Sequence, residues 1–196
     1  MTKHSLELKR WARWLATFIG FPLAGVAART VAGNIDSTSA AVMGGLAAGA
    51  VLGAVQAGIG GIDRDGRLRW IGATASGFAA GLAVGAGAVD FQTDPTSLAA
   101  MGAVTGAFVG LAQAASVPMR VFDRLLWAAA TPVLWAGGWL ITSQVIVDTD
   151  RQHAVFGSSG AIAVSALAGV LYAVRQSNAP GAAVLEAASA GPAVAS

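Results

Sequence analysis

The stretch Gly45-Leu-Ala-Ala-Gly49-Ala-Val-Leu-Gly53-Ala-Val-Gln56 decides the fold of this chain, because it recurs 57 residues later as Gly102-Ala-Val-Thr-Gly106-Ala-Phe-Val-Gly110-Leu-Ala-Gln113. Glycines four residues apart lie on one face of a helix. In an apolar segment, such a row lets the backbone of a second helix approach closely, which is one way that helices associate in lipid. The pattern therefore predicts membrane helices packed through six glycines: Gly45, Gly49, Gly53, Gly102, Gly106 and Gly110.

The composition of the whole chain supports a membrane environment. Of 196 residues, 55% are hydrophobic and only 11% are charged, and the mean hydropathy is +0.64. An ordinary soluble domain is less apolar than this. Since a helix needs roughly 20 apolar residues to cross a bilayer, six crossings use nearly all of the chain and leave no room for a soluble catalytic domain. We therefore expect an all-α, polytopic membrane protein.

Six apolar windows are long enough to be predicted as transmembrane helices. They cover residues 11–32, 40–60, 70–89, 98–117, 125–147 and 154–174. Pro22 and Pro132 fall inside the first and fifth windows, where proline usually kinks a helix. Residues 1–175 then form one transmembrane domain, and the tail 176–196, rich in Ala, Gly, Pro and Ser, is predicted to be disordered.

The basic residues predict the orientation of the chain. Ten of the twelve Lys and Arg residues fall on one side of the six predicted spans, and only Arg29 and Arg151 fall on the other. Because basic loops stay in the cytoplasm, both termini are predicted to be cytoplasmic in a cell membrane, with the first helix retained as a span. Four tryptophans at the cytoplasmic ends of spans are expected at headgroup level: Trp11, Trp14, Trp70 and Trp127.

The recurrence extends beyond the glycines. Residues 45–81 match residues 102–138 at 13 positions without a gap, and Gln56/Gln113 and Trp70/Trp127 are among the matches. A weaker match at the same shift includes Thr17 opposite Thr74. We interpret this as a duplicated helical hairpin present three times, over about 10–60, 67–117 and 124–175. Two spans per unit give parallel repeats rather than inverted ones.

Five polar residues are predicted to share one level of the bundle: Thr17, Thr74, Thr131, Gln56 and Gln113. The simpler interpretation is interhelical hydrogen bonding, which contributes about 0.6–2 kcal/mol per contact in lipid. The alternative is a polar constriction through which a small solute or ion passes, because converging polar groups in a membrane usually mark a pathway. Both interpretations stay open at this stage.

The residues needed for catalysis or cofactor binding are scarce. The chain has no cysteine, and its two histidines are His4 and His153. The run 157–160, Gly-Ser-Ser-Gly, resembles the Gly-x-Ser-Gly motif of rhomboid intramembrane proteases, but activating Ser159 would require a histidine on a later span. Asp148, Asp150 and His153 could form an outer cation site, but we predict that Asp150 or Thr149 caps the last helix instead. We expect no enzyme activity, no cofactor and no metal site.

The glycine rows, the Gln residues and the Arg-Trp hairpins together resemble uncharacterised small multi-pass bacterial membrane proteins built from repeated Gly/Ala-rich hairpins. That resemblance covers most of residues 10–175, but it implies packing and no activity. We therefore predict a non-enzymatic structural, accessory or scaffolding protein, with a channel or facilitator as the alternative. Its expected partners are the lipid bilayer and other membrane proteins or a second copy of the chain, and not nucleic acid.

Overall fold

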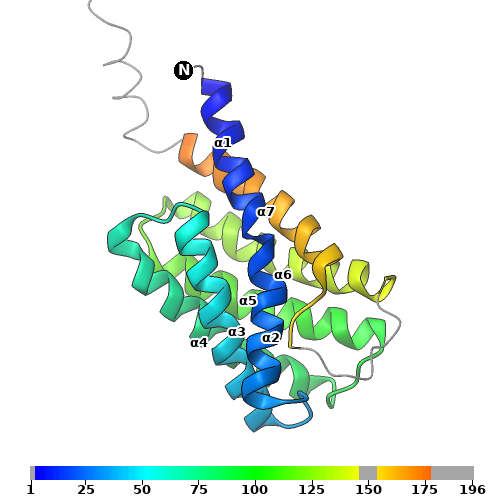
Figure 1. Ribbon diagram of the computed structural model, residues 1–196. Helices are drawn as coiled ribbons and strands as arrows, with labels where there is room; N and C mark the ends of the chain where they lie inside the picture. Colours follow the sequence, from blue (N-terminus) through cyan, green and yellow to red (C-terminus); the bar gives the residue numbers. More distant parts are fainter. Residues whose placement is uncertain (1–2, 146–153, 178–196) are drawn as a thin grey trace, which may run out of the picture.

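The computed structural model describes residues 3–145 and 154–177, and within these ranges it contains helices and no β-strand (Figure 1). The helices are α1 (Lys3–Ala16), α2 (Gly20–Ala32), α3 (Thr38–Ile59), α4 (Arg67–Ala88), α5 (Pro95–Ser116), α6 (Val121–Ser143) and α7 (Ser158–Ser177). Two short 3-10 turns, Thr17–Ile19 and Arg64–Gly66, join α1 to α2 and lead into α4.

Five of the helical segments are long and apolar enough to cross a membrane. They are Ser5–Ala32, which takes in most of α1 and all of α2, and then α3, Arg64–Ala88, α5 and α6. The apolar part of α7, Ser158–Ala173, is shorter. These helices are compatible with a multi-pass membrane protein.

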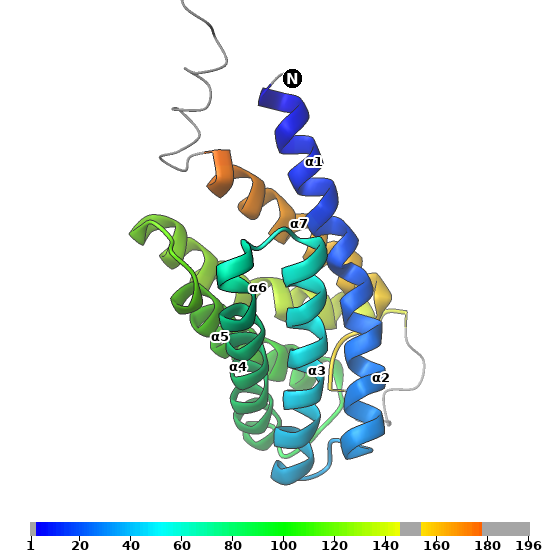
Figure 2. The same ribbon diagram turned by 60° about the vertical axis from the view of Figure 1, so that its left-hand side comes forward.

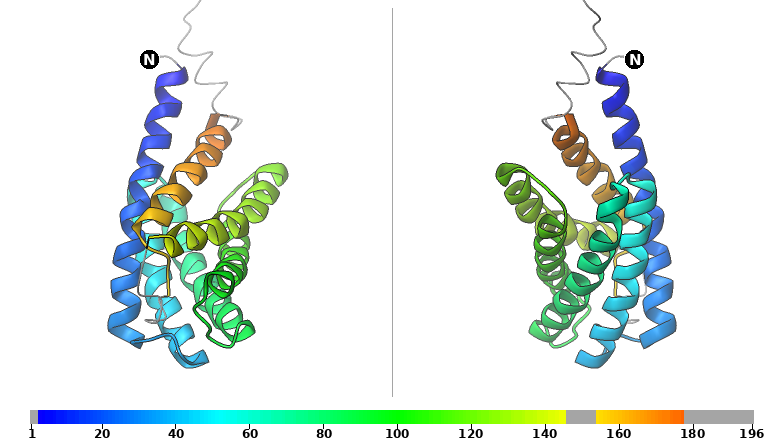
Figure 3. Two further views of the ribbon diagram at one scale, coloured as in Figure 1. Left: turned by 90° about the vertical axis from the view of Figure 1, so that its right-hand side faces the viewer. Right: turned by 90° about the vertical axis from the view of Figure 1, so that its left-hand side faces the viewer.

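The helices pack in chain order around the bundle. Each of α2 to α6 contacts the next helix, and α7 contacts both α6 and α1. Figures 1 and 2 show α7 lying beside α1, so the last helix returns to the first. Figure 3 shows α6 crossing the bundle at a large angle to α1 and α2. The interior of the bundle is thus bounded by all six helical segments.

The first segment changes its helical geometry just before Pro22. The 3-10 turn Thr17–Ile19 separates α1 from α2. Proline has no N–H to donate to the carbonyl four residues earlier, which is that of Phe18, and its ring crowds that carbonyl. A short 3-10 piece relieves such a conflict without ending the helix. The segment therefore continues through Pro22 to Ala32.

Helix α5 has a strong start outside the apolar region. Asp94 accepts hydrogen bonds from the backbone N–H groups of Thr96 and Ser97, at 3.0 and 3.1 Å, and Pro95 occupies the first turn. The side-chain hydroxyl of Ser97 also donates to the Asp94 carboxylate. These hydrogen bonds, that of the Ser97 hydroxyl above all, lower the pKa of Asp94. Carboxylate capping and proline at the first position are both favourable helix starts.

The last two predicted helix boundaries are wrong. Helix α6 ends at Ser143 rather than at 147, and α7 begins at Ser158 rather than at 154. Residues 154–156 are buried outside any helix, and the Phe156 ring stacks on Phe21 at 4.7 Å. Burial of this phenylalanine in the core takes precedence over the local helical pattern. Helix α7 also includes residues 176 and 177 of the predicted tail. Residues 178–196, the predicted cap at Thr149 or Asp150, and the residues Asp148 and His153 lie outside the described residues.

The glycines of α3 face the backbone of α4. A Cβ atom added at Gly45 would lie 2.7 Å from the Cα atom of Ala79. One added at Gly49 would lie 2.6 Å from the Cα atom of Ala75. At Gly53 the corresponding distance, to Cα of Ile71, is 3.0 Å. These distances leave no room for a side chain, so the two helices touch backbone to backbone.

The glycines of α5 face α6 in the same way. A Cβ atom at Gly106 would lie 2.8 Å from the carbonyl oxygen of Thr131, and one at Gly110 would lie 2.8 Å from Cβ of Thr131. Gly102 lies against the indole of Trp139. A further row on α4 faces α5 and consists of Gly77, Gly81 and Gly85. Our sequence-based prediction did not include this row, although its four-residue spacing is visible in the sequence.

Candidate functional site

The most polar part of the interior is built from the same hydrogen bond made twice. The indole N–H of Trp70 on α4 donates to Gln56 Oε1 on α3 at 3.1 Å, and that of Trp127 on α6 donates to Gln113 Oε1 on α5 at 3.1 Å. Each pair is separated by 14 residues in the sequence. Because an indole nitrogen can only donate, it fixes which end of each carboxamide is the oxygen.

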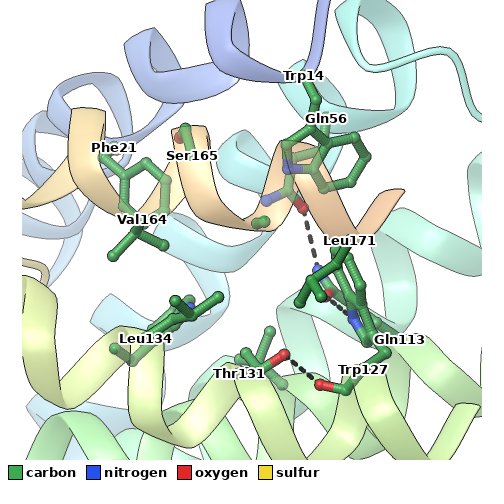
Figure 4. Close-up of a pocket in the computed structure, with 13 residues that line it drawn as sticks. Trp14, Phe21, Gln56, Gln113, Trp127, Thr131, Leu134, Val164, Ser165 and Leu171 are labelled. Atoms are coloured by element: carbon green, nitrogen blue, oxygen red, sulfur yellow. Dashed lines mark hydrogen bonds between the residues drawn. The ribbon is translucent and has the colours of Figure 1, made fainter. Parts of the chain in front are cut away.

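The two pairs are joined to each other through Gln113. Its amide nitrogen donates to Gln56 Oε1 at 3.0 Å and to the hydroxyl oxygen of Thr74 at 3.0 Å. Figure 4 shows Gln56, Gln113 and Trp127 converging from α3, α5 and α6. The network therefore links four consecutive helices, α3 to α6. We call these residues, Gln56, Trp70, Thr74, Gln113 and Trp127, the polar layer.

The three predicted threonines are all buried but take part unequally. Thr17, Thr74 and Thr131 each donate to a carbonyl of their own helix, at 2.7, 2.8 and 2.7 Å. Only Thr74 also contacts a glutamine. Thr131 lines the cavity beside Gln113, whereas Thr17 does not line it. Of the five predicted residues, the structure thus joins Gln56, Gln113 and Thr74 directly.

Three tryptophans pack against one another, and two of them, Trp70 and Trp127, belong to the polar layer. Trp14, Trp70 and Trp127 lie with ring centroids 5.5–6.1 Å apart, and Tyr172 stacks on Trp14 at 4.4 Å. Their exposed fractions are 1%, 0% and 6%. These three indoles are therefore covered by other parts of the protein, and their predicted position at headgroup level stays a prediction. Two of them have a buried acceptor in a glutamine, which offsets the loss of water on burial.

A second group of aromatic rings lies around Trp135. Trp135 contacts Phe21 at 6.1 Å, Phe78 at 5.1 Å and Phe156 at 5.5 Å. Along the first segment, along α4 and along α6, the order is the same: aromatic, threonine, aromatic. The threonines at this level therefore lie between two groups of packed rings.

The space left within the polar layer is small. The cavity there amounts to about 20 Å³ of room for the centre of a water molecule. Its polar lining comes from Gln56, Gln113, Thr131 and Ser165, and aromatic and aliphatic side chains supply the rest. Figure 4 shows this lining.

Two larger clefts lie towards the surface of the molecule. One of about 330 Å³ lies between the loop before α4, the end of α5 and α7, and its lining includes Asp63, Asp65, Arg69 and Tyr172. The other, of about 360 Å³, lies between α2 and the start of α7 and is mostly apolar. In the part of the chain that the structure describes, no group of three or more His, Cys, Asp or Glu residues could hold a metal ion.

The sequence-based interpretation missed several buried hydroxyls. Thr105 donates to the carbonyl of Met101 within α5, and Thr142 accepts the backbone N–H of Gly157 at 3.0 Å, which ties the start of α7 to α6. Ser165 on α7 lines the cavity. The tryptophans of the polar layer were also missed as glutamine partners. The sequence did contain a pattern that predicts these pairs, because a tryptophan follows each glutamine after 14 residues in both copies of the repeat.

Comparison with known proteins does not extend this description. No protein family model matches the chain, and no curated protein or solved structure is significantly similar to it. Its function is therefore argued from the geometry of the bundle.

Proposed function

We propose that this chain is a non-enzymatic membrane protein with six crossings and a structural, accessory or scaffolding role. The observation that carries the proposal is the enclosure of the polar layer. The acceptor oxygens of both glutamines accept hydrogen bonds within the layer, and aromatic rings pack within the layer and beside it. A solute pathway needs polar groups free to replace the water that the solute loses.

The repeated geometry supports an architecture of three parallel hairpins. The Gln56–Trp70 hydrogen bond has its counterpart in Gln113–Trp127, shifted by 57 residues. The glycine rows of α3 and α5 also face the following helix in the same way. Close contact between backbones gains dispersion energy, which matters in lipid because burial of apolar surface drives association little there. We propose that the duplicated unit was retained for this packing.

One exposed face of α4 is suited to association with another membrane helix. Gly72, Ser76 and Ala80 lie four residues apart on the outside of the bundle. A Cβ atom added at Gly72 would meet nothing within 4 Å. Small residues spaced in this way let a second helix approach closely. We propose that this face contacts a partner helix in the membrane.

Photo-cross-linking in native membranes tests this role. A benzophenone amino acid placed at Ser76 is expected to give a cross-linked species of higher mass. The matched control is the same amino acid at Val133 of α6, whose side chain is 71% exposed. Equal cross-linking at both positions, or none at Ser76, would contradict association through the small-residue face.

A facilitator for a small solute or ion is the second candidate. It is favoured by the cavity, which sits among glutamine and threonine side chains. Purified protein in liposomes distinguishes the two candidates through osmotic swelling and the leak of a pH-sensitive dye. We expect no flux above that of protein-free liposomes. Flux that is present in the native protein and lost in the double variant Gln56→Leu/Gln113→Leu would favour the facilitator.

A further inference from the structure

We propose that the cavity in the polar layer is a binding site for one water molecule, which bridges Ser165 of α7 to Gln56 of α3. The site does not depend on the proposed structural role. It is argued from a buried hydroxyl, a buried amide and the space between them.

Ser165 is the exception among the buried hydroxyls. Its side chain is 2% exposed, and its Oγ atom has no hydrogen-bond partner within the described residues. The buried threonines all make hydrogen bonds, four of them to a carbonyl of their own helix segment and Thr142 to a backbone N–H. Leaving a buried hydroxyl without a partner is unfavourable. Ser165 therefore needs a partner from outside the described residues.

Gln56 has unused donors beside the same cavity. Trp70 and Gln113 both donate to Gln56 Oε1, so the indole of Trp70 fixes the orientation of the carboxamide. No hydrogen bond among the described residues uses Gln56 Nε2, and the residue is 7% exposed. Figure 4 shows this nitrogen on the side of the carboxamide away from Gln113. Its two N–H groups are thus available to a bound water molecule.

The cavity has the size and the lining that a water molecule requires. A buried water needs on the order of 10–15 Å³ of room for its centre and two to four polar partners. The cavity offers about 20 Å³. A water there can accept from Gln56 Nε2 and donate to Ser165 Oγ, which turns about one side-chain bond. These two partners meet the minimum that a buried water needs, and Gln113 and Thr131 also line the cavity.

A water bridge would connect α7 to the polar layer by hydrogen bonds, although α7 has no glutamine at the position equivalent to Gln56 and Gln113. The 57-residue shift that carries Gln56 to Gln113 places Val170 at the third position. Valine can make no hydrogen bond to the layer, whereas Ser165 lies on the same helix and lines the cavity. A bound water extends the reach of this short side chain. It would connect α7 to the network that links α3 to α6.

The variant Ser165→Ala tests whether the hydroxyl of Ser165 is hydrogen-bonded to a water molecule or has no partner. If water bridges the hydroxyl, Ser165→Ala is expected to lower the Tm in lipid nanodiscs by about 2–4 °C. The matched control is Ser76→Ala, because Ser76 is exposed and already bonds to the carbonyl of Gly72 at 2.9 Å. That control is expected to change the Tm by less than about 1 °C. An unchanged or higher Tm for Ser165→Ala would overturn the proposal, because removal of an unpartnered hydroxyl is neutral or stabilising.

Nuclear magnetic resonance observes the water directly. With 15N-labelled glutamine, we expect a cross-peak between a long-lived water and the side-chain amide protons of Gln56, assigned with Gln56→Leu. The cross-peak should disappear in Ser165→Ala and persist in Ser76→Ala. Its absence from the native protein would overturn the proposal even if Ser165→Ala lowered the Tm.

Discussion

The helices α3 to α6 and the pair formed by α1 and α7 are held together by different kinds of contact. Between α3 and α4, glycines bring backbone atoms together, as at Gly49 and Ala75. Between α1 and α7 the contacts include several aromatic side chains, and a Cβ atom at Gly169 would lie 3.3 Å from the carbonyl oxygen of Trp11. Trp11 donates to the carbonyl of Ala166 at 3.0 Å, and Trp14 stacks on Tyr172.

This difference predicts how well each kind of helix contact tolerates an amino-acid substitution. A backbone cannot move away from an added methyl group without separating two whole helices. An aromatic side chain can turn, or can lose one polar atom while it keeps its packing area. A Cβ atom at Gly169 would meet Trp11 no closer than 3.1 Å, at a side-chain atom. We therefore expect the α3–α6 region to be more sensitive to small substitutions than the α1–α7 pair.

The largest effect is expected for Gly49→Ala. The added Cβ would lie 2.6 Å from both the Cα atom of Ala75 and the carbonyl oxygen of Thr74. Overpacking of this kind should cost ~3 kcal/mol of unfolding free energy, seen as a lower Tm or as loss of monodisperse protein. The larger side chains of Gly49→Leu or Gly106→Leu, which are more severe forms of the same change, should prevent folding. Gly58→Ala is the control on the same helix, because its Cβ would meet nothing within 4 Å, and it should be neutral or stabilising.

A smaller effect is expected within the polar layer. Gln113→Leu removes the acceptor of the Trp127 indole and should lower the unfolding free energy by about 2 kcal/mol. Trp127→Phe removes the donor, so the double variant should lose less than the sum of the two single variants. Unfolding of the four proteins of this double-mutant cycle measures the coupling. Strict additivity would mean that the indole–carboxamide bond contributes nothing to stability.

The smallest effect is expected for Tyr172→Phe in the α1–α7 region. It removes the hydrogen bond from the phenol to the carbonyl of Gly61, at 3.1 Å, and keeps the ring that stacks on Trp14. The unfolding free energy should fall by about 0.5–1.5 kcal/mol. A loss as large as that of Gly49→Ala, measured in the same nanodiscs, would remove the distinction between the two regions.

The features predicted well are those encoded over short distances in the chain. Hydropathy and the caps place the second, third and fourth helical segments within a few residues, as with α5, which begins at Pro95 after the Asp94 cap, whereas the first helix starts at Lys3, well before the predicted residue 11. The start of α7 was missed because Phe156 is buried by contacts with distant residues such as Phe21. No local pattern near residue 154 shows that this ring leaves the helix for the core.

Part of the candidate site could be predicted from the sequence. The glutamines and threonines stand out because polar residues are rare in these segments, and Gln56 and Gln113 do meet in the structure. The burial of Trp14 and Trp70 could not be predicted from the sequence. A tryptophan near the end of a span suits the membrane interface as well as a closed core, and only a buried acceptor decides between them.

The sequence by itself determined that this chain forms apolar helices with glycine rows, because hydropathy and four-residue spacing are local properties of each segment. Only the tertiary structure decided that the indoles of Trp70 and Trp127 turn inward to Gln56 and Gln113 and that Ser165 lies beside the same cavity. The physical reason is that a hydrogen bond between helices depends on how those helices pack. That packing is set by all of the backbone contacts together and by no single stretch of residues.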